Sequence, residues 1–331
     1  MTETFRAMMI DTVDGRPQAA FREISMADLP DHDVLIEIAY STLNYKDGLA
    51  ISGKGRIARR TPMVAGVDLA GTVVSSRSPE WNSGDRVVLN GWGLSETEWG
   101  AFTRFQRVKP EWLIPLPAAF SMQQAMAIGT AGYTAALCVD ALETWGTITP
   151  GEGEILVTGA AGGVGSVAIS LLAARGYRVI ASTGRPDTEE YLTSLGAIGI
   201  IDRATLAEKG GPLQKEHWTG GIDSVGSTTL ANALAQTVRG GAIAACGLAG
   251  GADLPGTVMP HILRAVTLIG VDSVYATRTQ RLAAWERLSR DLDPAHLDSM
   301  TTVAPMSDLP ELAETIVAGR IRGRVVIDVN A

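Results

Sequence analysis

A glycine-rich turn between an apolar strand and a helix is the feature that most constrains the fold of this chain. Residues Glu154–Thr158 read EILVT, and the turn GAAGGVG follows at Gly159–Gly165. Ala160, Gly162 and Gly165 occupy the three positions of the dinucleotide-binding pattern, where larger side chains would obstruct the tight turn, the pyrophosphate or the contact between helix and strand. The next helix points its free N–H groups and its positive dipole end toward a bound pyrophosphate. The order strand, turn, helix therefore predicts a dinucleotide site.

The end of the next strand indicates which dinucleotide binds. This strand reads YRVIAST and ends about 20 residues beyond the turn, where NAD-binding chains place an acidic residue for the ribose 2′-hydroxyl. The chain has Ser182, Thr183 and Arg185 there instead. A guanidinium and two hydroxyls suit a 2′-phosphate, which a carboxylate would repel. The sequence thus predicts NADPH as cofactor, although Arg185 as a solvated loop cation stays open.

Length and composition limit the remaining possibilities. The 331 residues suit two domains, and the net charge of -8 argues against general nucleic-acid binding. No apolar run approaches the ~18 residues of a membrane span, and the N-terminus lacks a signal-peptide pattern. Cys138 and Cys246 lie in apolar surroundings, which is typical of reduced core thiols. We therefore expect a cytoplasmic protein without membrane or nucleic-acid partners.

The order of the predicted elements gives the fold class. Short strands broken by Gly, Pro and Asp fill roughly the first 120 residues, and alternating strands and helices follow to about residue 293. The tail returns to a helix at Leu309–Ala318 and a strand at Arg324–Val329. We predict an α/β protein with a β-rich substrate domain at 1–124 and 300–331. A doubly wound parallel-sheet (Rossmann) domain at 125–299 should bind NADPH, with the active site in the cleft between the domains.

This organisation and several motifs resemble the medium-chain dehydrogenase/reductase superfamily, whose first domain is GroES-like. The motifs are NYKD, GVDLAG, GDRV, GTAGYTA and the terminal GRVVIDV. Zinc-dependent members carry Gly-His-Glu where this chain has Gly66-Val67-Asp68, and they use clustered cysteines that this chain lacks. Its four histidines are scattered along the sequence. We therefore expect no metal and a zinc-independent reaction.

Longer strings resemble the acrylyl-CoA reductase family within the zinc-free branch. They include TLNYKDGLAISGKG, LNGWG, EWGAF, STGR, ACGLAGG and VMPHILR, and they extend over most of the chain. The resemblance implies NADPH-dependent reduction of acryloyl-CoA to propionyl-CoA by a homodimeric enzyme. Hydride addition to the β-carbon would be followed by protonation of the enolate. An NADPH-dependent quinone or enone oxidoreductase and a non-catalytic NADPH-binding protein remain alternatives.

The resemblance also implies the site residues. Asn44 and Tyr45 would donate to the thioester oxyanion, and Arg324 would supply positive charge; structural roles for all three stay open. We expect dimer contacts near the strand at 267–274. Together with Gly162 of the turn and Ser182, Thr183 and Arg185 of the strand end, the resemblance gives as cofactor contacts Tyr45, Thr130, Gly163, Val164, Arg203, Leu248, Ile262 and Ser273.

A basic segment provides independent support for a CoA substrate. Lys46 to Arg60 contains five cations, with Asp47 as the only acid. In an acidic chain, such a cluster is suited to the phosphates of CoA, although a solvated basic loop is the alternative. The residues predicted to hold these phosphates are Lys54, Arg56, Arg59 and Arg60.

Overall fold

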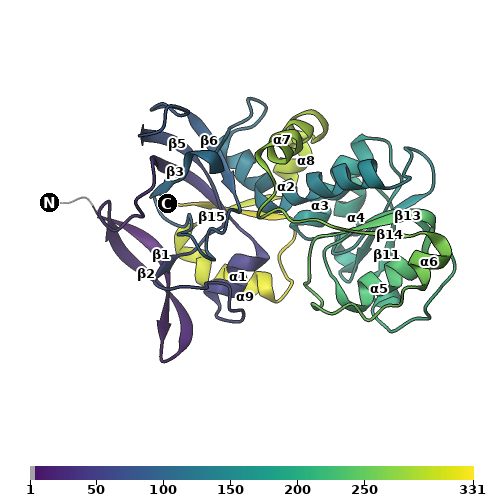
Figure 1. Ribbon diagram of the computed structural model, residues 1–331. Helices are drawn as coiled ribbons and strands as arrows, with labels where there is room; N and C mark the ends of the chain where they lie inside the picture. Colours follow the sequence, from purple (N-terminus) through teal and green to yellow (C-terminus); the bar gives the residue numbers. More distant parts are fainter. Residues whose placement is uncertain (1–3) are drawn as a thin grey trace. The chain divides into compact units, whose positions relative to one another are not determined.

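The computed structural model describes residues 4–331, which fall into two compact units (Figure 1). The β-rich unit comprises the chain up to Thr130 together with Val274–Leu282 and Leu297–Ala331, and the parallel-sheet unit comprises Ala131–Ser273 and Ala283–His296. The sequence assigned 274–282 to the Rossmann domain, whereas its contacts lie in the β-rich unit. The reason is Arg281, whose buried guanidinium donates to the carbonyls of Asn90 and Val274 at 2.6 and 2.7 Å.

Two sheets form the β-rich unit. The smaller has the strand order β2-β1-β4, and the larger runs β15-β16-β3-β5-β6-β8, with β7 also paired to β3. Alternating buried residues of these strands, such as Ile36, Ile38 and Leu69, build the larger apolar core, and Leu35 and Phe105 contribute to a second cluster with β1. The strands are β1 (Thr4–Val13), β2 (Arg16–Ser25), β3 (Val34–Leu43), β4 (Met63–Val64), β5 (Asp68–Ser76), β6 (Arg86–Asn90), β7 (Phe105–Val108), β8 (Ile114–Pro115), β15 (Thr301–Pro305) and β16 (Arg324–Asp328).

Two helices of this unit pack side by side, as Figure 1 shows. These are α1 (Tyr45–Ile51) and α9 (Leu309–Val317). Gly48 allows the close approach, because a Cβ there would overlap the side chain of Ile316. The N-terminus of α1, which carries Tyr45, is thereby fixed against the terminal segment of the chain.

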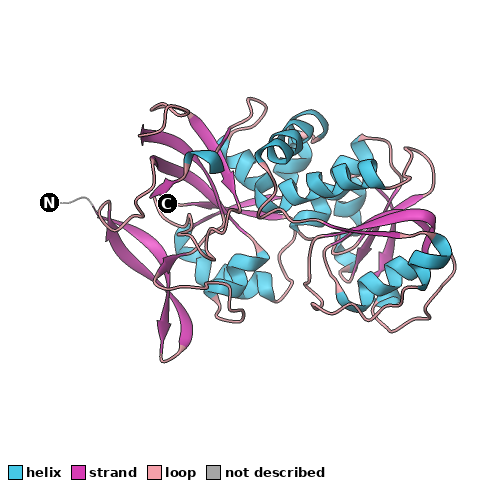
Figure 2. Cartoon of the chain, in the orientation of Figure 1, coloured by secondary structure: helices cyan, strands magenta, loops and turns pink. Residues whose placement is uncertain are grey.

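The second unit is built around a six-stranded parallel sheet. Its order is β11-β10-β9-β12-β13-β14, so the order reverses between β9 and β12, as in dinucleotide-binding folds. Figure 2 shows helices flanking this sheet, and Figure 1 shows α5 and α6 on the opposite side from α3. The strands are β9 (Glu154–Val157), β10 (Val179–Thr183), β11 (Ala197–Asp202), β12 (Trp218–Asp223), β13 (Thr237–Ala245) and β14 (Thr267–Gly270). The remaining helices are α2 (Met122–Trp145), α3 (Gly163–Ala174), α4 (Glu189–Ser194), α5 (Ser227–Ala235), α6 (Met259–Arg264), α7 (Arg278–Asp291) and α8 (Pro294–Ser299).

Helix α2 is long and apolar, and it is interrupted at Gly129. Gly129 has φ 49° and ψ -161°, a backbone conformation that favours glycine. By length and composition, α2 is the one helix within residues 4–331 that could cross a membrane, but 83% of its apolar stretch is buried inside the protein.

Gly165 sets the closest approach between α3 and the glycine-rich turn. A Cβ there would lie 2.6 Å from Cα of Ala160 and 2.6 Å from the carbonyl oxygen of Gly159. Both atoms belong to the backbone, so neither can rotate away. The third glycine of the pattern is therefore required by packing, as the sequence predicted.

We expect Gly165→Ala to destabilise the protein. Overpacking of this kind costs about 1–3 kcal/mol, which exceeds the ~1 kcal/mol that alanine gains inside a helix. The measurement is the thermal midpoint by calorimetry, which should fall, since each 1 kcal/mol of net destabilisation lowers it by about 2–4 °C. Gly256→Ala is the matched control in the same unit, because a Cβ there would make only an ordinary contact, 3.7 Å from Cβ of Ala231. Equal midpoints for the two variants would contradict this packing.

Candidate active site

The glycine-rich turn presents backbone donors at the carboxyl end of β9. Gly162 is the N-cap of α3, and it leads into Gly163 and Val164 in the first turn of that helix. The N–H of Ala160 donates to the carbonyl of Ser182 at 3.2 Å, which ties the turn to the end of β10. A pyrophosphate at this position would meet free N–H groups at the positive end of a 12-residue helix.

Two guanidinium groups gather where β10 ends. Arg185 Nη2 donates to the carbonyl of Ala161 at 3.2 Å, so this side chain folds back over the turn. Arg203 lies against Gly184, since a Cβ at Gly184 would overlap its guanidinium. Ser182 and Thr183 lie beside them, largely buried. The structure thus assembles four of the predicted cofactor residues into one polar cluster suited to a 2′-phosphate.

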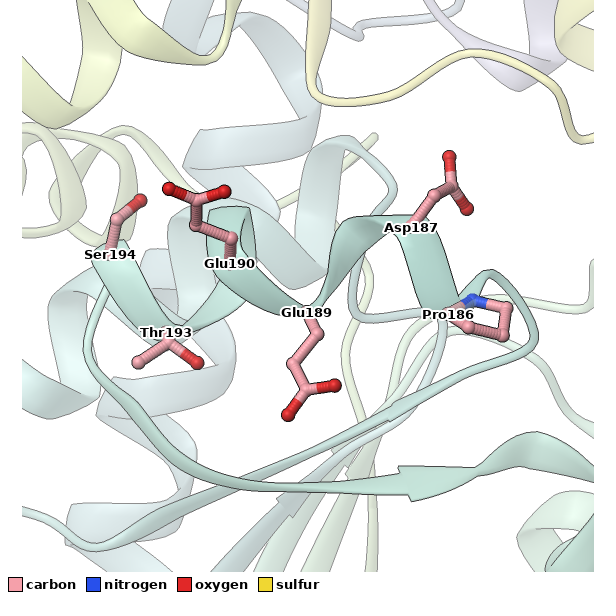
Figure 3. A pocket seen from close by; sticks show the side chains of 6 residues that line it. All are labelled: Pro186, Asp187, Glu189, Glu190, Thr193 and Ser194. Carbon is pink, nitrogen blue, oxygen red and sulfur yellow. The ribbon is translucent and has the colours of Figure 1, made fainter.

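A shallow hollow immediately after Arg185 has the opposite charge. Figure 3 shows its lining by Asp187, Glu189 and Glu190, with Glu189 and Glu190 extending in opposite directions. No cation is among its lining residues, which come from the 3-10 turn Pro186–Thr188 and from α4. Three carboxylates repel a phosphate, so this hollow does not suit a dinucleotide.

Three predicted cofactor contacts lie farther along the parallel-sheet unit. Leu248 and Ser273 follow β13 and β14, at the carboxyl ends of these strands, the same edge of the sheet as the glycine-rich turn. Leu248 is 59% exposed. Ile262 lies on α6 and is 71% exposed.

In the β-rich unit, a buried carboxylate organises the polar residues. Asp68 has no exposed surface and accepts four hydrogen bonds. Asn44 Nδ2 and the N–H of Thr130 donate to Oδ2 at 2.8 and 2.9 Å, while Asn90 Nδ2 and Thr130 Oγ1 donate to Oδ1 at 2.7 and 2.6 Å. Four donors satisfy both oxygens, which stabilises a buried negative charge.

Asn44 is held between opposite charges. Its Nδ2 donates to Asp68 and, at 3.2 Å, to Asp47, while its Oδ1 accepts from Arg324 Nη2 at 3.2 Å. Arg324 is 3% exposed and donates also to Thr42 Oγ1 and the carbonyl of Ala127. Both amide hydrogens of Asn44 are therefore used inside the protein. Asn44 thus has no amide hydrogen left to donate to a thioester oxyanion, the role that was predicted for it. The guanidinium of Arg324, predicted to supply positive charge, lies inside the protein next to Asn44.

The interruption of α2 supplies two of these contacts. A regular helix would bond the N–H of Thr130 and the carbonyl of Ala127 internally, but the backbone at Gly129 breaks that pattern. Thr130 then donates to Asp68, and Ala127 accepts from Arg324 Nε at 2.7 Å. Thr130, a predicted cofactor contact, is therefore fixed by Asp68.

Tyr45 and Asp47 share the first turn of α1 but differ in environment. Tyr45 is half-buried, and its hydroxyl has no hydrogen-bond partner among residues 4–331. Asp47 is fully buried; its Oδ2 accepts from the backbone N–H of Asn44 at 2.9 Å, while its Oδ1 has no partner within the described residues. Burial, reinforced by the negative charge of Asp68, raises the pKa of Asp47 to about 7.

The basic segment is more neutralised than its sequence suggests. Glu96 pairs with Lys46 and Arg59, Glu98 with Arg60, and Glu314 with Lys54. Partial burial pushes the pKa of Glu96 upward, but the hydrogen bond and charge of Lys46 outweigh it and leave this pKa below its usual range. Asp47 is the only acid within the segment itself, but these glutamates come from other parts of the chain and pair with its cations. Arg56 is exposed and has no ion-pair partner in residues 4–331.

The residues present do not fit a zinc ion. Asp68 stands where zinc-dependent relatives carry a glutamate, and its oxygens are occupied by hydrogen bonds. Within residues 4–331 no group of three His, Cys, Asp or Glu side chains could hold a metal ion. The histidines serve elsewhere, for example His296 at Ser170 Oγ and His261 at the carbonyl of Val266.

Sequence reasoning missed Asp68 as the centre of this site. It was noticed only as a departure from the zinc motif. The available signal was a carboxylate inside the apolar string GVDLAG, since a charge buried in a strand requires several donors. Asn90, another of these donors, was not singled out either.

Comparisons with known proteins agree with this arrangement. The family model described as "Alcohol dehydrogenase GroES-like domain" matches residues 30–118, and "Zinc-binding dehydrogenase" matches 163–290. The acrylyl-CoA reductase AcuI of Ruegeria pomeroyi is 50% identical over 330 residues, covering 99% of this chain and 100% of that protein. The chain belongs to the acrylyl-CoA reductase family. The predicted superfamily, with its GroES-like and Rossmann-type domains, is thereby confirmed.

Solved structures of other family relatives contain dinucleotides. Escherichia coli YhdH with bound NADPH is 47% identical, with a TM-score of 0.95 over 98% of this chain and all of that one. Bacillus subtilis YhfP, named a putative quinone oxidoreductase, was solved with NAD bound; it is 41% identical, with a TM-score of 0.94 over 99% of this chain and all of that one.

The pKa of Asp47 gives a testable dependence of stability on pH. A carboxyl whose pKa is higher in the folded than in the unfolded protein makes folding less favourable as pH rises from about 4 to about 7. The full effect is on the order of 4 kcal/mol. We expect Asp47→Asn to gain stability relative to the wild type between pH 5 and pH 8, because asparagine stays neutral.

Urea unfolding of both proteins at these two pH values measures the effect. Asp85→Asn is the control, a change of the same type at a half-buried turn of the same unit. A difference between wild type and Asp47→Asn that is the same at both pH values would contradict the raised pKa.

Proposed function

We propose that this chain reduces acryloyl-CoA to propionyl-CoA with NADPH. The observation that carries the proposal is the cluster of Arg185 and Arg203 at the end of β10, in a chain that resembles an acrylyl-CoA reductase along its whole length. Bound NADPH supplies the hydride in such a reaction. The structure fits this cofactor because the turn offers backbone N–H groups and the cluster at the end of β10 offers two guanidinium groups.

The protein's own task is to hold the charge that develops on the thioester oxygen. Addition of hydride to the β-carbon leaves an enolate, and the α-carbon then takes a proton. Tyr45 carries a hydroxyl without an internal partner, next to the fixed Asn44. We assign Tyr45 as the donor to the oxyanion, and Asn44 and Arg324 as the residues that fix its position.

Arg56 is the cation best placed to bind a CoA phosphate. Lys54, Arg59 and Arg60 have carboxylate partners, so a phosphate would have to compete with glutamates at those positions. Arg56 faces no such competition. We propose that it makes the main contact and that the three paired cations add to the local positive potential.

We also propose that the enzyme is a cytoplasmic homodimer. Strand β14 is an edge strand whose outer side is unpaired within the described sheet, and Val258, the N-cap of α6, and Leu263 on that helix are 66% and 47% exposed. Pairing of two β14 strands would cover both features. A monomeric mass in light scattering would contradict this assembly.

The function is tested with a substrate panel of acryloyl-CoA, its N-acetylcysteamine thioester and a simple quinone. We expect NADPH oxidation to be fastest with acryloyl-CoA, and Tyr45→Phe to lower kcat about a hundredfold. Tyr40→Phe on β3 of the same unit is the control.

Arg56→Glu should raise KM for acryloyl-CoA about tenfold but leave KM unchanged for the thioester without phosphates.

Preference for the quinone would favour the oxidoreductase named for the Bacillus relative. NADPH binding with no turnover of any activated alkene or quinone would favour a binding protein. Either result would overturn the proposed reaction.

The cofactor assignment is tested separately by calorimetric binding. Arg185→Ala should weaken NADPH binding about 10- to 100-fold, since a charge-assisted contact contributes about 1.5–3 kcal/mol, and should leave NADH binding unchanged. Arg178→Ala, a half-exposed cation before β10 that faces Glu154, is the control. Equal losses for NADPH and NADH would show that Arg185 does not contact the 2′-phosphate.

A further inference from the structure

Asp68 occupies an unusual place for a charge. It begins strand β5 and is fully buried, yet it makes no ion pair within residues 4–331. Its neighbours along the strand, Leu69 and Ala70, belong to the apolar interior. An apolar residue at this position would stabilise the fold equally well. The contacts of Asp68 therefore point to a role in placing other groups.

The first of those groups is Asn44. The amide of asparagine can be placed in two orientations, and the charges around it select one: Asp68 attracts the Nδ2 hydrogens and Arg324 attracts Oδ1. Asn44 is also the N-cap of α1, so its position sets where the helix begins. Tyr45 is the first residue of that helix.

The second group is the backbone at the interruption of α2. The backbone at Gly129 departs from helical geometry, and next to it Asp68 accepts from both the N–H and the hydroxyl of Thr130. A Cβ at Gly129 would lie 2.8 Å from Arg324 Nη2 and 3.2 Å from Asp68 Oδ2. The interruption thus brings the carboxylate and the guanidinium to the same small region around Asn44.

We infer that Asp68 is a positioning residue for the reaction: through Asn44 it fixes the start of α1 and with it the hydroxyl of Tyr45. The inference rests on the proposed function only in taking Tyr45 as the group that contacts the substrate. Asp68 itself is too deeply buried to reach a ligand.

A double-mutant cycle tests this inference. We expect Asp68→Asn to lower kcat by about tenfold or more with little change in KM, because binding is intact and only the donor is misplaced. In a Tyr45→Phe background the same change should cost less than about threefold, since the hydroxyl that Asp68 places is already gone. Equal losses in both backgrounds would mean that Asp68 only supports the fold, and would overturn the inference.

Two additions keep the test decisive. If Asp68→Asn does not fold, Asn44→Ala breaks the same link while leaving the carboxylate with three donors, and it should show the same dependence on Tyr45. If the wild type reduces no thioester, the double-mutant cycle is run with a quinone or enone that it does reduce. The proposed substrate can then be wrong while the inference about Asp68 still holds.

A 19F NMR measurement tests the position of Tyr45 without any turnover of substrate. In protein labelled with 3-fluorotyrosine, the 19F resonance that disappears in Tyr45→Phe belongs to Tyr45. It should shift or broaden in Asp68→Asn, while the resonances of Tyr177 and Tyr191 in the other unit stay in place. An unchanged Tyr45 resonance would overturn the inference.

Discussion

The buried carboxylate of Asp68 is the constraint on which the β-rich unit depends. An ionised group in an apolar interior is tolerated only when strong donors surround it, and those donors come from α1, β6 and α2. The requirement explains features that look unrelated in the sequence: an asparagine before a short helix, an asparagine at the end of a strand, and a glycine that interrupts a 24-residue helix. Arg324 compensates the charge indirectly, through Asn44.

The parallel-sheet unit places positive charge at one small region of a chain that is acidic overall. The chain is acidic, with a net charge of -8, yet it must attract a highly anionic dinucleotide. We propose that Arg185 and Arg203, at the end of one strand beside a helix N-terminus, attract it, while acidic residues such as Glu189 and Glu190 lie on the helix that follows. Short-range contacts therefore outweigh the unfavourable overall charge.

The sequence predicted the features that arise from local patterns. The glycine-rich turn, the alternation of strands and helices and the cations after β10 are each contiguous, so their consequences could be derived from neighbouring residues. The network around Asp68 joins residues 44, 68, 90, 130 and 324, which only the fold brings together. The same limitation hid Glu96, Glu98 and Glu314 from the basic segment, and it hid the link that places 274–282 in the β-rich unit, because Arg281 bonds to the distant Asn90.

The central claim is that a dinucleotide hydride reaches the β-carbon of an enoyl thioester while the protein holds the resulting charge on oxygen. The most direct measurement is to reduce acryloyl-CoA with NADPH deuterated at the transferred position of the nicotinamide and to locate the label in the product by NMR. The account predicts one deuterium on the β-carbon of propionyl-CoA and a solvent-derived hydrogen on the α-carbon. Deuterium on the α-carbon, or an unlabelled product, would contradict it.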